Sequence, residues 1–326
     1  MSAAPLVSVV MANYNGARHL GEAIVSLQRQ TMPDWELILV DDASTDDSVA
    51  VAKAMAADDP RIRPILQARN RGPAAARNRA LDVARGAWIA IFDSDDVMTP
   101  RRLERLLART RRTGAEIVAD DQLVCRADLS EGVRFIGEAR AERLARVDLA
   151  TFIDSSRLYS RLPDLGFAKP LISAALIART GARYDESLRI GEDFHFLLAL
   201  LASGAELHLQ PEALYLYRKH GASISHRFTP EVLAAMIAAD MSLRTRLPDR
   251  AARSAMRRRI EGLKSWAVSE RVMVAAKAGR WLTAAFEAAR RPHAWPLIAR
   301  PIRRRLAEPL KPRAARPLAF SAEEGA

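Results

Sequence analysis

The stretch Trp88–Asp96, WIAIFDSDD, joins an apolar run to three carboxylates within four positions, Asp93, Asp95 and Asp96. A short continuous apolar run is typical of a strand that is buried on both faces of a parallel sheet. Ligands of such sheets lie at the carboxyl ends of the strands, so these acids occur where a ligand is expected. Enclosed carboxylates repel one another, and a divalent cation such as Mg²⁺ or Mn²⁺ would neutralise them. A solvated acidic turn would explain the same residues.

The segments before this stretch alternate between strand and helix patterns. Strands are expected over 6–11, 35–40 and 62–66, with helices between them and over 73–85. Three β-α units followed by a fourth strand predict a largely parallel sheet with right-handed crossovers and helices on both faces. This is an α/β architecture of the kind that binds nucleotides.

Beyond Pro100 the pattern is looser. Expected elements are a helix over 101–113, a strand over 171–178, an apolar helix over 194–201 and closing strands over 207–209 and 214–217. The region from about 120 to 169 carries no pattern that assigns a role. From Pro230 the chain is rich in Ala and Arg with helical periodicity, which predicts an α-helical C-terminal extension.

The composition is that of a globular protein. The 326 residues, 49% hydrophobic and 27% charged, suffice for one large α/β domain with an appendage. The single cysteine, Cys125, excludes an internal disulfide framework and a cysteine-rich zinc site, and it fits a cytoplasmic protein. We find no pattern of a secretion signal and no apolar run of about eighteen residues, so no membrane-spanning helix is expected.

The formal net charge of +11 comes from the last hundred residues. Of the 50 Lys and Arg, 21 follow residue 226, against 9 of the 39 Asp and Glu. Basic clusters alternate there with aromatic side chains: Arg257–Arg259, Arg290–Arg291 and Arg303–Arg305 with Trp266, Trp281, Phe286 and Trp295. Cationic helices with aromatic residues suit an anionic membrane surface. A solvated helical surface would explain them equally well.

Polar residues follow the expected strands. Tyr14 can offer an aromatic face to a base, and the Asp42 carboxylate can accept the N–H of a uracil. Packing of Tyr14 and helix capping by Asp42 are the alternatives. At Gly72 a helix begins beside the same sheet edge, where free N–H groups attract anions, and Arg77 adds a positive charge. A core-packing helix with solvated arginines would also fit.

Two further candidates lie later in the chain. Glu192 and Asp193 occupy the first turn of a helix, where the helix dipole favours the ionised carboxylate that a general base needs; capping would explain them as well. His220 can ligate a metal or contact a phosphate, and Arg218 adds positive charge, although a loop histidine is usually solvated. The turn after the first strand, NYNG at 13–16, lacks the glycine fingerprint of dinucleotide-binding proteins, and no P-loop is found.

Five motifs occur in order: VSVVMANYN at 7–15, VDDASTD at 40–46, GPAAARN at 72–78, DSDD at 93–96 and GED at 191–193. Together they resemble the family 2 inverting glycosyltransferases over about 5–225. The resemblance implies the GT-A type of nucleotide-diphospho-sugar transferase fold, a mostly parallel central sheet flanked by helices. The expected domains are 1–226, with a donor-binding half up to about 100 and an acceptor-side half over 101–226, and a basic helical region over 227–326.

The resemblance also implies a reaction. A hexose would pass with inversion from a nucleotide sugar, expected to be a UDP-sugar such as UDP-glucose, to a saccharide acceptor, expected to be a lipid-linked intermediate of bacterial surface polysaccharide. Asp193 would be the catalytic base, and Asp95 and His220 would ligate Mn²⁺ or Mg²⁺. Substrate binding is implied for Ala12, Tyr14, Asp42, Gly72, Arg77, Asp93, Ser94, Glu192 and Arg218. Among these, Tyr14 and Asp42 would hold the uracil and Asp93 the ribose side.

Departures from the family pattern refine these expectations. Processive relatives carry Q-x-x-R-W, whereas Lys277–Trp281 reads KAGRW, so one sugar per encounter is expected. Ala43 replaces the glycine that commonly follows the paired acids. A sugar-nucleotide nucleotidyltransferase is an alternative, but its glycine-rich loop is missing. A nucleic-acid-binding protein would explain the basic charge, but no recognised module accompanies it, so no nucleic acid is expected as a partner. The expected location is cytoplasmic, with peripheral attachment to the inner face of the bacterial membrane.

Overall fold

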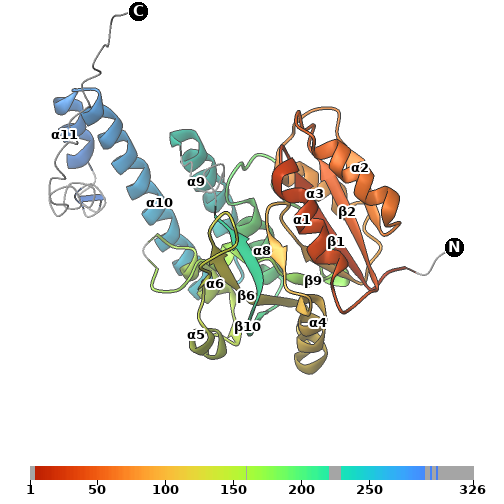
Figure 1. Cartoon of the computed structure of the whole chain (residues 1–326). Coiled ribbons are helices and arrows are strands. Elements are labelled where there is room, and N and C mark those ends of the chain that lie inside the picture. Colours follow the sequence, from red (N-terminus) through yellow and green to blue (C-terminus); the bar gives the residue numbers. More distant parts are fainter. Residues whose placement is uncertain (1–3, 159, 220–228, 291–293, 296–298, 300–326) are drawn as a thin grey trace, which may run out of the picture. The chain divides into compact units, whose positions relative to one another are not determined.

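The computed structural model describes residues 4–158, 160–219, 229–290, 294–295 and 299 (Figure 1). The chain divides into two compact units, Met1–Lys264 and Ser265–Ala326. In chain order the elements are β1 (Val7–Asn13), α1 (Ala17–Gln28), β2 (Trp35–Asp41), α2 (Ser48–Asp58), β3 (Ile62–Leu66), α3 (Pro73–Leu81), β4 (Trp88–Ile91), β5 (Val97–Met98), α4 (Arg102–Thr113), β6 (Ile117–Cys125), β7 (Val133–Arg134), α5 (Glu138–Arg143), β8 (Arg146–Val147), α6 (Leu149–Ser155), η1 (Leu165–Phe167), β9 (Leu171–Ser173), α7 (Ala174–Thr180), α8 (Glu192–Ala202), β10 (Leu207–Arg218), α9 (Pro230–Arg244), α10 (Arg250–Lys277) and α11 (Trp281–Ala289).

The strands of the described residues form a ten-stranded sheet in the order β3-β2-β1-β4-β9-β6-β10-β5, with β7 beside β6 and β8 beside β10. β3, β2, β1 and β4 are parallel, which confirms the parallel sheet expected for the N-terminal half. β6 and β10 are also parallel, whereas β9 and β5 run antiparallel to their neighbours. The long pairings are thus parallel and the short ones antiparallel.

Helices bury both faces of this sheet. Val9 of β1 packs in one apolar cluster with residues of α1, α2 and α4, and Val10 packs in another with residues of α3, α6 and α8. Figure 1 shows α1, α2 and α3 around β1 and β2. Because successive side chains of a strand point to opposite faces, burial on both sides requires the continuous apolar runs seen in the sequence.

The parallel register aligns the ends of the strands that precede the polar motifs. Asn13 at the end of β1 pairs with Asp41 at the end of β2, and Val10 pairs with Ile91 at the end of β4. The turns that follow β1, β2 and β4 therefore meet at one edge of the sheet. The motifs around Tyr14, Asp42 and Asp93 are brought together by this register.

Four expected elements differ clearly in extent. The strand expected over 171–178 ends at Ser173, because the Ser173 hydroxyl accepts the N–H of Leu176 and caps α7. The helix expected over 73–85 ends at Leu81. The chain leaves the helix there and passes so close to β1 that a Cβ on Gly86 would lie 2.4 Å from the Ser8 nitrogen. The two expected closing strands form one strand, β10, with register shifts between Gln210 and Tyr215.

The helical C-terminal region begins at Pro230, as the composition predicts. Its first part belongs to the core of the larger unit, where Ala252 and Met256 of α10 are fully buried. In the part of the chain that the structure describes, no helix has the length and apolar character needed to cross a membrane.

A buried polar cluster, His195, Asp240 and Arg259, joins α8 to α9 and α10. Asp240 Oδ1 lies 2.9 Å from His195 Nε2, and Asp240 Oδ2 accepts a hydrogen bond of 3.0 Å from Arg259 Nε. The Arg259 guanidinium also lies over the Phe194 ring, 3.8 Å from its centroid. Phe194 and His195 directly follow Asp193, so α9 and α10 support the helix turn that carries the expected base.

Candidate active site

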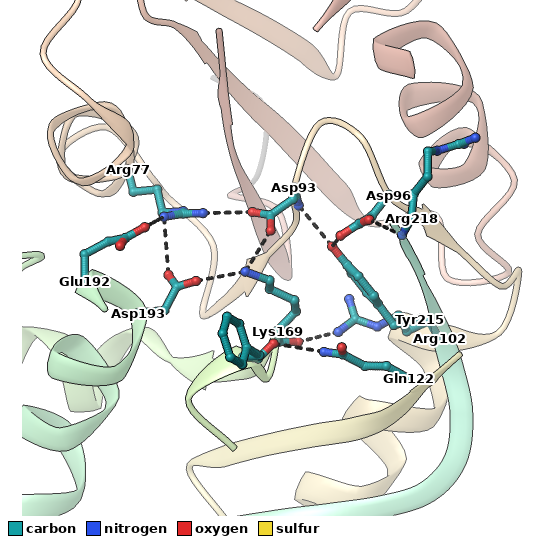
Figure 2. A network of polar contacts seen from close by, with 11 residues as sticks. Arg77, Asp93, Asp96, Arg102, Gln122, Lys169, Glu192, Asp193, Tyr215 and Arg218 are labelled. Carbon is teal, nitrogen blue, oxygen red and sulfur yellow. Dashed lines mark hydrogen bonds and ion pairs between the residues drawn. The ribbon is translucent and has the colours of Figure 1, made fainter. Parts of the chain in front are cut away.

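Charged side chains from four segments meet at the carboxyl edge of the sheet (Figure 2). Asp93 follows β4, and Arg77 comes from α3. Glu192 and Asp193 form the first turn of α8, and Lys169 lies just before β9. Figure 2 shows Arg77 and Lys169 placed among the three carboxylates. The structure thus brings together four residues that the sequence predicts for the site and a fifth, Lys169, for which the sequence indicates no role.

The distances define a network in which cations and carboxylates alternate. Arg77 Nη2 lies 2.8 Å from Asp93 Oδ1, and Arg77 Nη1 lies 2.9 Å from Glu192 Oε1 and 3.3 Å from Asp193 Oδ1. Lys169 Nζ lies 2.7 Å from Asp93 Oδ2 and 2.8 Å from Asp193 Oδ2. The side chains of both cations are 6% exposed. Ions this well buried persist only when they are paired. Here two cations face three carboxylates, and they balance two of the three negative charges.

The pKa values follow from burial and from these contacts. Burial alone would raise the pKa of Asp93, but Lys169 and Arg77 hold it well below its usual range. Burial would lower the pKa of Lys169, but Asp193 and Asp93 raise it well above the usual value. Burial and the adjacent Asp193 raise the pKa of Glu192. At neutral pH the Lys169–Asp93 contact is therefore an ion pair.

Backbone hydrogen bonds position Lys169. Its carbonyl accepts a hydrogen bond from Arg102 Nη2, and the carbonyl of Phe167 accepts one of 3.0 Å from Gln122 Nε2. The N–H of Ile91 donates to Pro170 O at 3.1 Å. The segment is thus tied to α4, β6 and β4. One sequence signal could have revealed this residue: Lys169 stands in an otherwise apolar stretch, FAKPLI, and a buried lysine requires a partner.

The acidic turn after β4 forms a candidate metal site. Ligand atoms of Asp93, Asp95 and Asp96 lie within 4.8 Å of one another. Asp96 is fully buried and accepts hydrogen bonds of 2.7 Å from the Tyr215 hydroxyl and the Arg218 N–H. Burial, together with Asp95 and Asp93, raises the pKa of Asp96. A set of carboxylate oxygens is the donor set that Mg²⁺ and Mn²⁺ prefer, so these residues fit a divalent cation.

Arg218, expected to bind substrate, contacts the acidic turn from the end of β10. Its side chain is 3% exposed. Its guanidinium donates to Asp95 O at 2.8 Å, to Ala127 O, and to Glu22 Oε2 of α1 at 2.5 Å. These contacts use the side chain to fix the turn in place. His220, the other residue expected nearby, lies outside the described residues.

The residues expected around the nucleoside lie at the same edge. Tyr14 is 49% exposed just after β1, whereas Asp42 is 2% exposed. Asp42 Oδ1 accepts hydrogen bonds from Arg71 N (2.8 Å) and Gln67 Nε2 (3.0 Å), and Oδ2 accepts one from Gly72 N (2.7 Å). The Asp42 carboxylate therefore holds the loop that leads into α3.

Gly72 is required at the end of that loop. Its φ of 91° and ψ of 166° belong to a region that essentially only glycine adopts. A Cβ there would also lie 3.2 Å from Arg189 Nη1. The last two expected residues, Ala12 in β1 and Ser94 in the acidic turn, are half-buried at the same edge.

Comparison with known proteins identifies the family. Residues 8–164 match the model of glycosyl transferase family 2. The chain is 38% identical over 261 residues to succinoglycan biosynthesis protein ExoO of Rhizobium meliloti (strain 1021), an alignment that covers 80% of this chain and 74% of ExoO. It is 33% identical over 235 residues to ExoU of the same organism, covering 69% of this chain and 66% of ExoU. The chain belongs to glycosyltransferase family 2 and is an enzyme of that class.

Solved structures of glycosyltransferases share its fold. TarS 1-349 of S. aureus superposes with a TM-score of 0.62 at 16% identity, covering 87% of this chain and 91% of that one. The mannosyltransferase PcManGT from Pyrobaculum calidifontis, solved with GDP-Man and Mn²⁺, gives a TM-score of 0.57 at 18% identity, covering 94% and 82%. These GT-A neighbours confirm the fold that the motifs predict.

Proposed function

We propose that this enzyme is an inverting, metal-dependent, non-processive hexosyltransferase that uses a nucleotide sugar, with a UDP-hexose such as UDP-glucose as the first candidate. The observation that carries the proposal is the link between Asp193 and Asp93 through Lys169 and Arg77. This network joins Asp193, the proposed base, to the acidic turn. The carboxylates of that turn suit a metal ion that binds the diphosphate of the donor. TarS, solved with UDP and with UDP-GlcNAc, and PcManGT, solved with GDP-Man, support a nucleotide-sugar donor.

The donor would lie over the edge formed by β1, β2 and β4. Tyr14 offers an exposed ring for the base, and Asp42 shapes the adjoining loop. Asp95, with Asp93 and Asp96 beside it, would hold Mn²⁺ or Mg²⁺. When bound, such a cation would neutralise negative charge on the departing nucleoside diphosphate. His220 stays a predicted further ligand, outside the described residues.

Asp193 would act as the general base. Its Oδ2 accepts a hydrogen bond of 2.8 Å from Lys169 Nζ, whereas Oδ1 accepts none from the described residues, although Arg77 Nη1 lies 3.3 Å away. One carboxylate oxygen thus retains hydrogen-bonding capacity. The acceptor hydroxyl would transfer its proton to Asp193 as its oxygen bonds to the anomeric carbon. The bond from that carbon to the diphosphate breaks on the opposite face, which inverts the configuration.

The acceptor would be a saccharide of bacterial surface polysaccharide, carried on a lipid. Support comes from ExoO and ExoU, which are named for succinoglycan biosynthesis. Glu192 is proposed to position this acceptor, because it lies beside Asp193 and is held by Arg77.

Peripheral attachment to an anionic membrane through the C-terminal region belongs to the same proposal. Trp281, Leu282 and Phe286 of α11 are 69%, 90% and 62% exposed. α11 carries no basic residue itself, but Arg280 and Arg290 flank it, and exposed aromatic and aliphatic side chains beside basic residues are typical of interfacial binding. The test is sedimentation with phosphatidylglycerol vesicles. The wild type and the control Val133→Ser, which changes an exposed residue of β7, should pellet with the vesicles, whereas the variant Leu282→Ser/Phe286→Ser should stay in the supernatant. Equal sedimentation of all three proteins would contradict the membrane role.

Calorimetric titration of UDP with and without Mn²⁺ tests the donor site. Binding should require Mn²⁺ and should be lost in Asp95→Ala. The matched control Asp58→Ala removes an exposed carboxylate at the end of α2 and should bind like the wild type. Metal-independent binding that both variants retain would contradict the proposed site. Release of UDP from UDP-glucose in the presence of saccharide acceptors would then identify the transferred sugar.

A further inference from the structure

An open pocket of about 340 Å³ lies where α9 meets α10, within the larger compact unit. Its lining residues are Arg244, Thr245, Arg250, Arg253, Ser254 and Arg257. The four that belong to α10 recur at positions i, i+3, i+4 and i+7, and therefore share one face of the helix. None of the six is acidic. The pocket volume falls within the range of about 300–1,000 Å³ typical of ligand sites.

The arginines of this pocket differ from their neighbours in the same helix. Arg258 pairs with Asp154 at 2.6 Å, and Arg259 pairs with Asp240 at 3.0 Å. By contrast, Arg244, Arg250 and Arg257 are exposed, and they form no ion pair with any residue that the structure describes. Positive groups gathered without a carboxylate repel one another, and a bound anion would relieve that repulsion.

Two side chains of the pocket are held in place. Arg253 Nη1 donates hydrogen bonds to the carbonyls of Leu247 at 2.7 Å and Pro248 at 3.3 Å. The Ser254 hydroxyl, which also lines the pocket, accepts a hydrogen bond of 2.9 Å from Arg258 Nη1. Part of the donor set is therefore oriented before any ligand arrives, which reduces the entropic cost of binding.

The nearest acid in sequence, Asp249, forms no ion pair with the pocket arginines that the structure describes. The Asp249 carboxylate accepts the N–H of Ala252 at 2.7 Å, which caps the first turn of α10. This cap uses one of the free N–H groups at the start of α10. Anion binding in the pocket would therefore depend on its guanidinium groups rather than on the helix terminus. Guanidinium groups form paired, charge-assisted hydrogen bonds to phosphate oxygens.

We propose that this pocket binds a phosphate or diphosphate group, separately from the donor site at the sheet edge. The same chemistry is offered by a soluble diphosphate and by the headgroup of an anionic lipid, and two arms of one experiment distinguish these sources. The variant Arg250→Gln/Arg257→Gln removes two guanidinium groups that have no described ion pair, so folding should be unaffected. The control Arg111→Gln/Arg112→Gln removes the same charge from the exposed end of α4.

The first arm titrates inorganic diphosphate into each full-length protein in EDTA, where the metal-dependent donor site is silent. The second sediments each protein with phosphatidylglycerol or phosphatidylcholine vesicles. We expect the pocket variant to lose at least about tenfold in affinity for diphosphate, for phosphatidylglycerol or for both, because charge-assisted bonds are lost. The control should match the wild type.

Loss in the diphosphate arm assigns the pocket to a soluble or exposed diphosphate, and loss in the vesicle arm alone assigns it to lipid headgroups. Wild-type protein that binds neither ligand, or pocket and control variants that lose equally, would overturn the proposal. Titration of UDP with Mn²⁺ into the same proteins keeps the two proposals distinct. The pocket variant should bind UDP normally, and failure of UDP to bind any protein would contradict the proposed function alone.

Discussion

Lys169 Nζ lies 2.8 Å from Asp193 Oδ2, so the carboxylate proposed as the base is paired with a buried lysine. The same ammonium lies 2.7 Å from Asp93 Oδ2. One cation thus connects the first turn of α8 to the turn that follows β4. Its placement depends on Arg102 of α4, which bonds its carbonyl, and on β9, which begins two residues after it.

Replacement of Lys169 by Met should destabilise the fold and abolish sugar transfer. It leaves the carboxylates of Asp93, Glu192 and Asp193 with Arg77 as their remaining cation, and breaking a buried pair costs about 3–5 kcal/mol. Lys169→Arg keeps the charge and should retain part of both properties. Urea unfolding and transfer rates measure these effects, with Lys53→Met on the exposed side of α2 as the control. Wild-type stability and rate in Lys169→Met would contradict the role of this lysine.

Asp193→Asn should reduce the transfer rate by about 10²–10⁴-fold, because the amide cannot accept the acceptor's proton. Binding of UDP with Mn²⁺ should change little, since the proposed nucleotide contacts lie on β1, β2 and β4. Initial rates and calorimetry on the same preparation separate the two properties. Asp58→Asn serves as the control, and substantial transfer by Asp193→Asn would exclude it as the base.

Glu36 should make stability depend on acid pH. Its carboxylate is buried, which alone would raise the pKa, but hydrogen bonds from Arg85, Ser8 and Arg63 lower the pKa to about 2. Because the folded-state pKa is below the ordinary value of 4.5, the stabilisation is complete above about pH 5 and is lost as the pH falls towards 2.

The corresponding measurement compares Glu36→Gln with the wild type by urea unfolding. The difference in unfolding free energy should be on the order of 2–3 kcal/mol at pH 7 and less than about half of that at pH 3. Glu142→Gln on the surface of α5 should show no such trend. A difference that is constant from pH 7 to pH 3 would rule out the hydrogen-bonded carboxylate as its source.

Gly72→Ala should weaken UDP binding as well as stability. The substitution strains the backbone at φ 91° by about 1–3 kcal/mol and displaces the N–H that donates to Asp42. Gly114→Ala is a matched control, because it also has a positive φ, 71°, but meets nothing within 4 Å. It should lower the melting temperature without changing UDP affinity. Equal effects of the two variants on UDP binding would argue against a role for the Asp42 loop.

The parallel half of the fold could be predicted from sequence because strands buried on both faces must be apolar throughout, and turns between them must be polar. The same logic failed over 171–178, where an apolar run fits a strand and a helix equally well and the Ser173 cap decides between them. The short antiparallel strand β5 was missed because it is too brief to form a pattern.

The candidate site was predicted as far as its residues belong to local motifs. Arg77, Asp93, Glu192 and Asp193 were recognised, and the structure places them in one network, while their roles stay predictions. Lys169 was not recognised, because its partners come from distant segments and no local spacing records them. Arg218 was recognised from its charge; the structure shows that its side chain bonds to the acidic turn, and its role towards the substrate stays a prediction.

The cluster of His195, Asp240 and Arg259 means that the enzyme cannot be trimmed to its motif-bearing part. A chain cut after residue 226 would lose the carboxylate and the guanidinium that brace the start of α8, and would uncover apolar surface that Met256 now protects. The geometry of the candidate active site therefore depends on α9 and α10, which carry none of the five sequence motifs. Engineered hybrids that exchange C-terminal regions between relatives should keep the contacts of Asp240 and Arg259 with α8. Without these contacts, the position of the first turn of α8, and with it the active site, is expected to change.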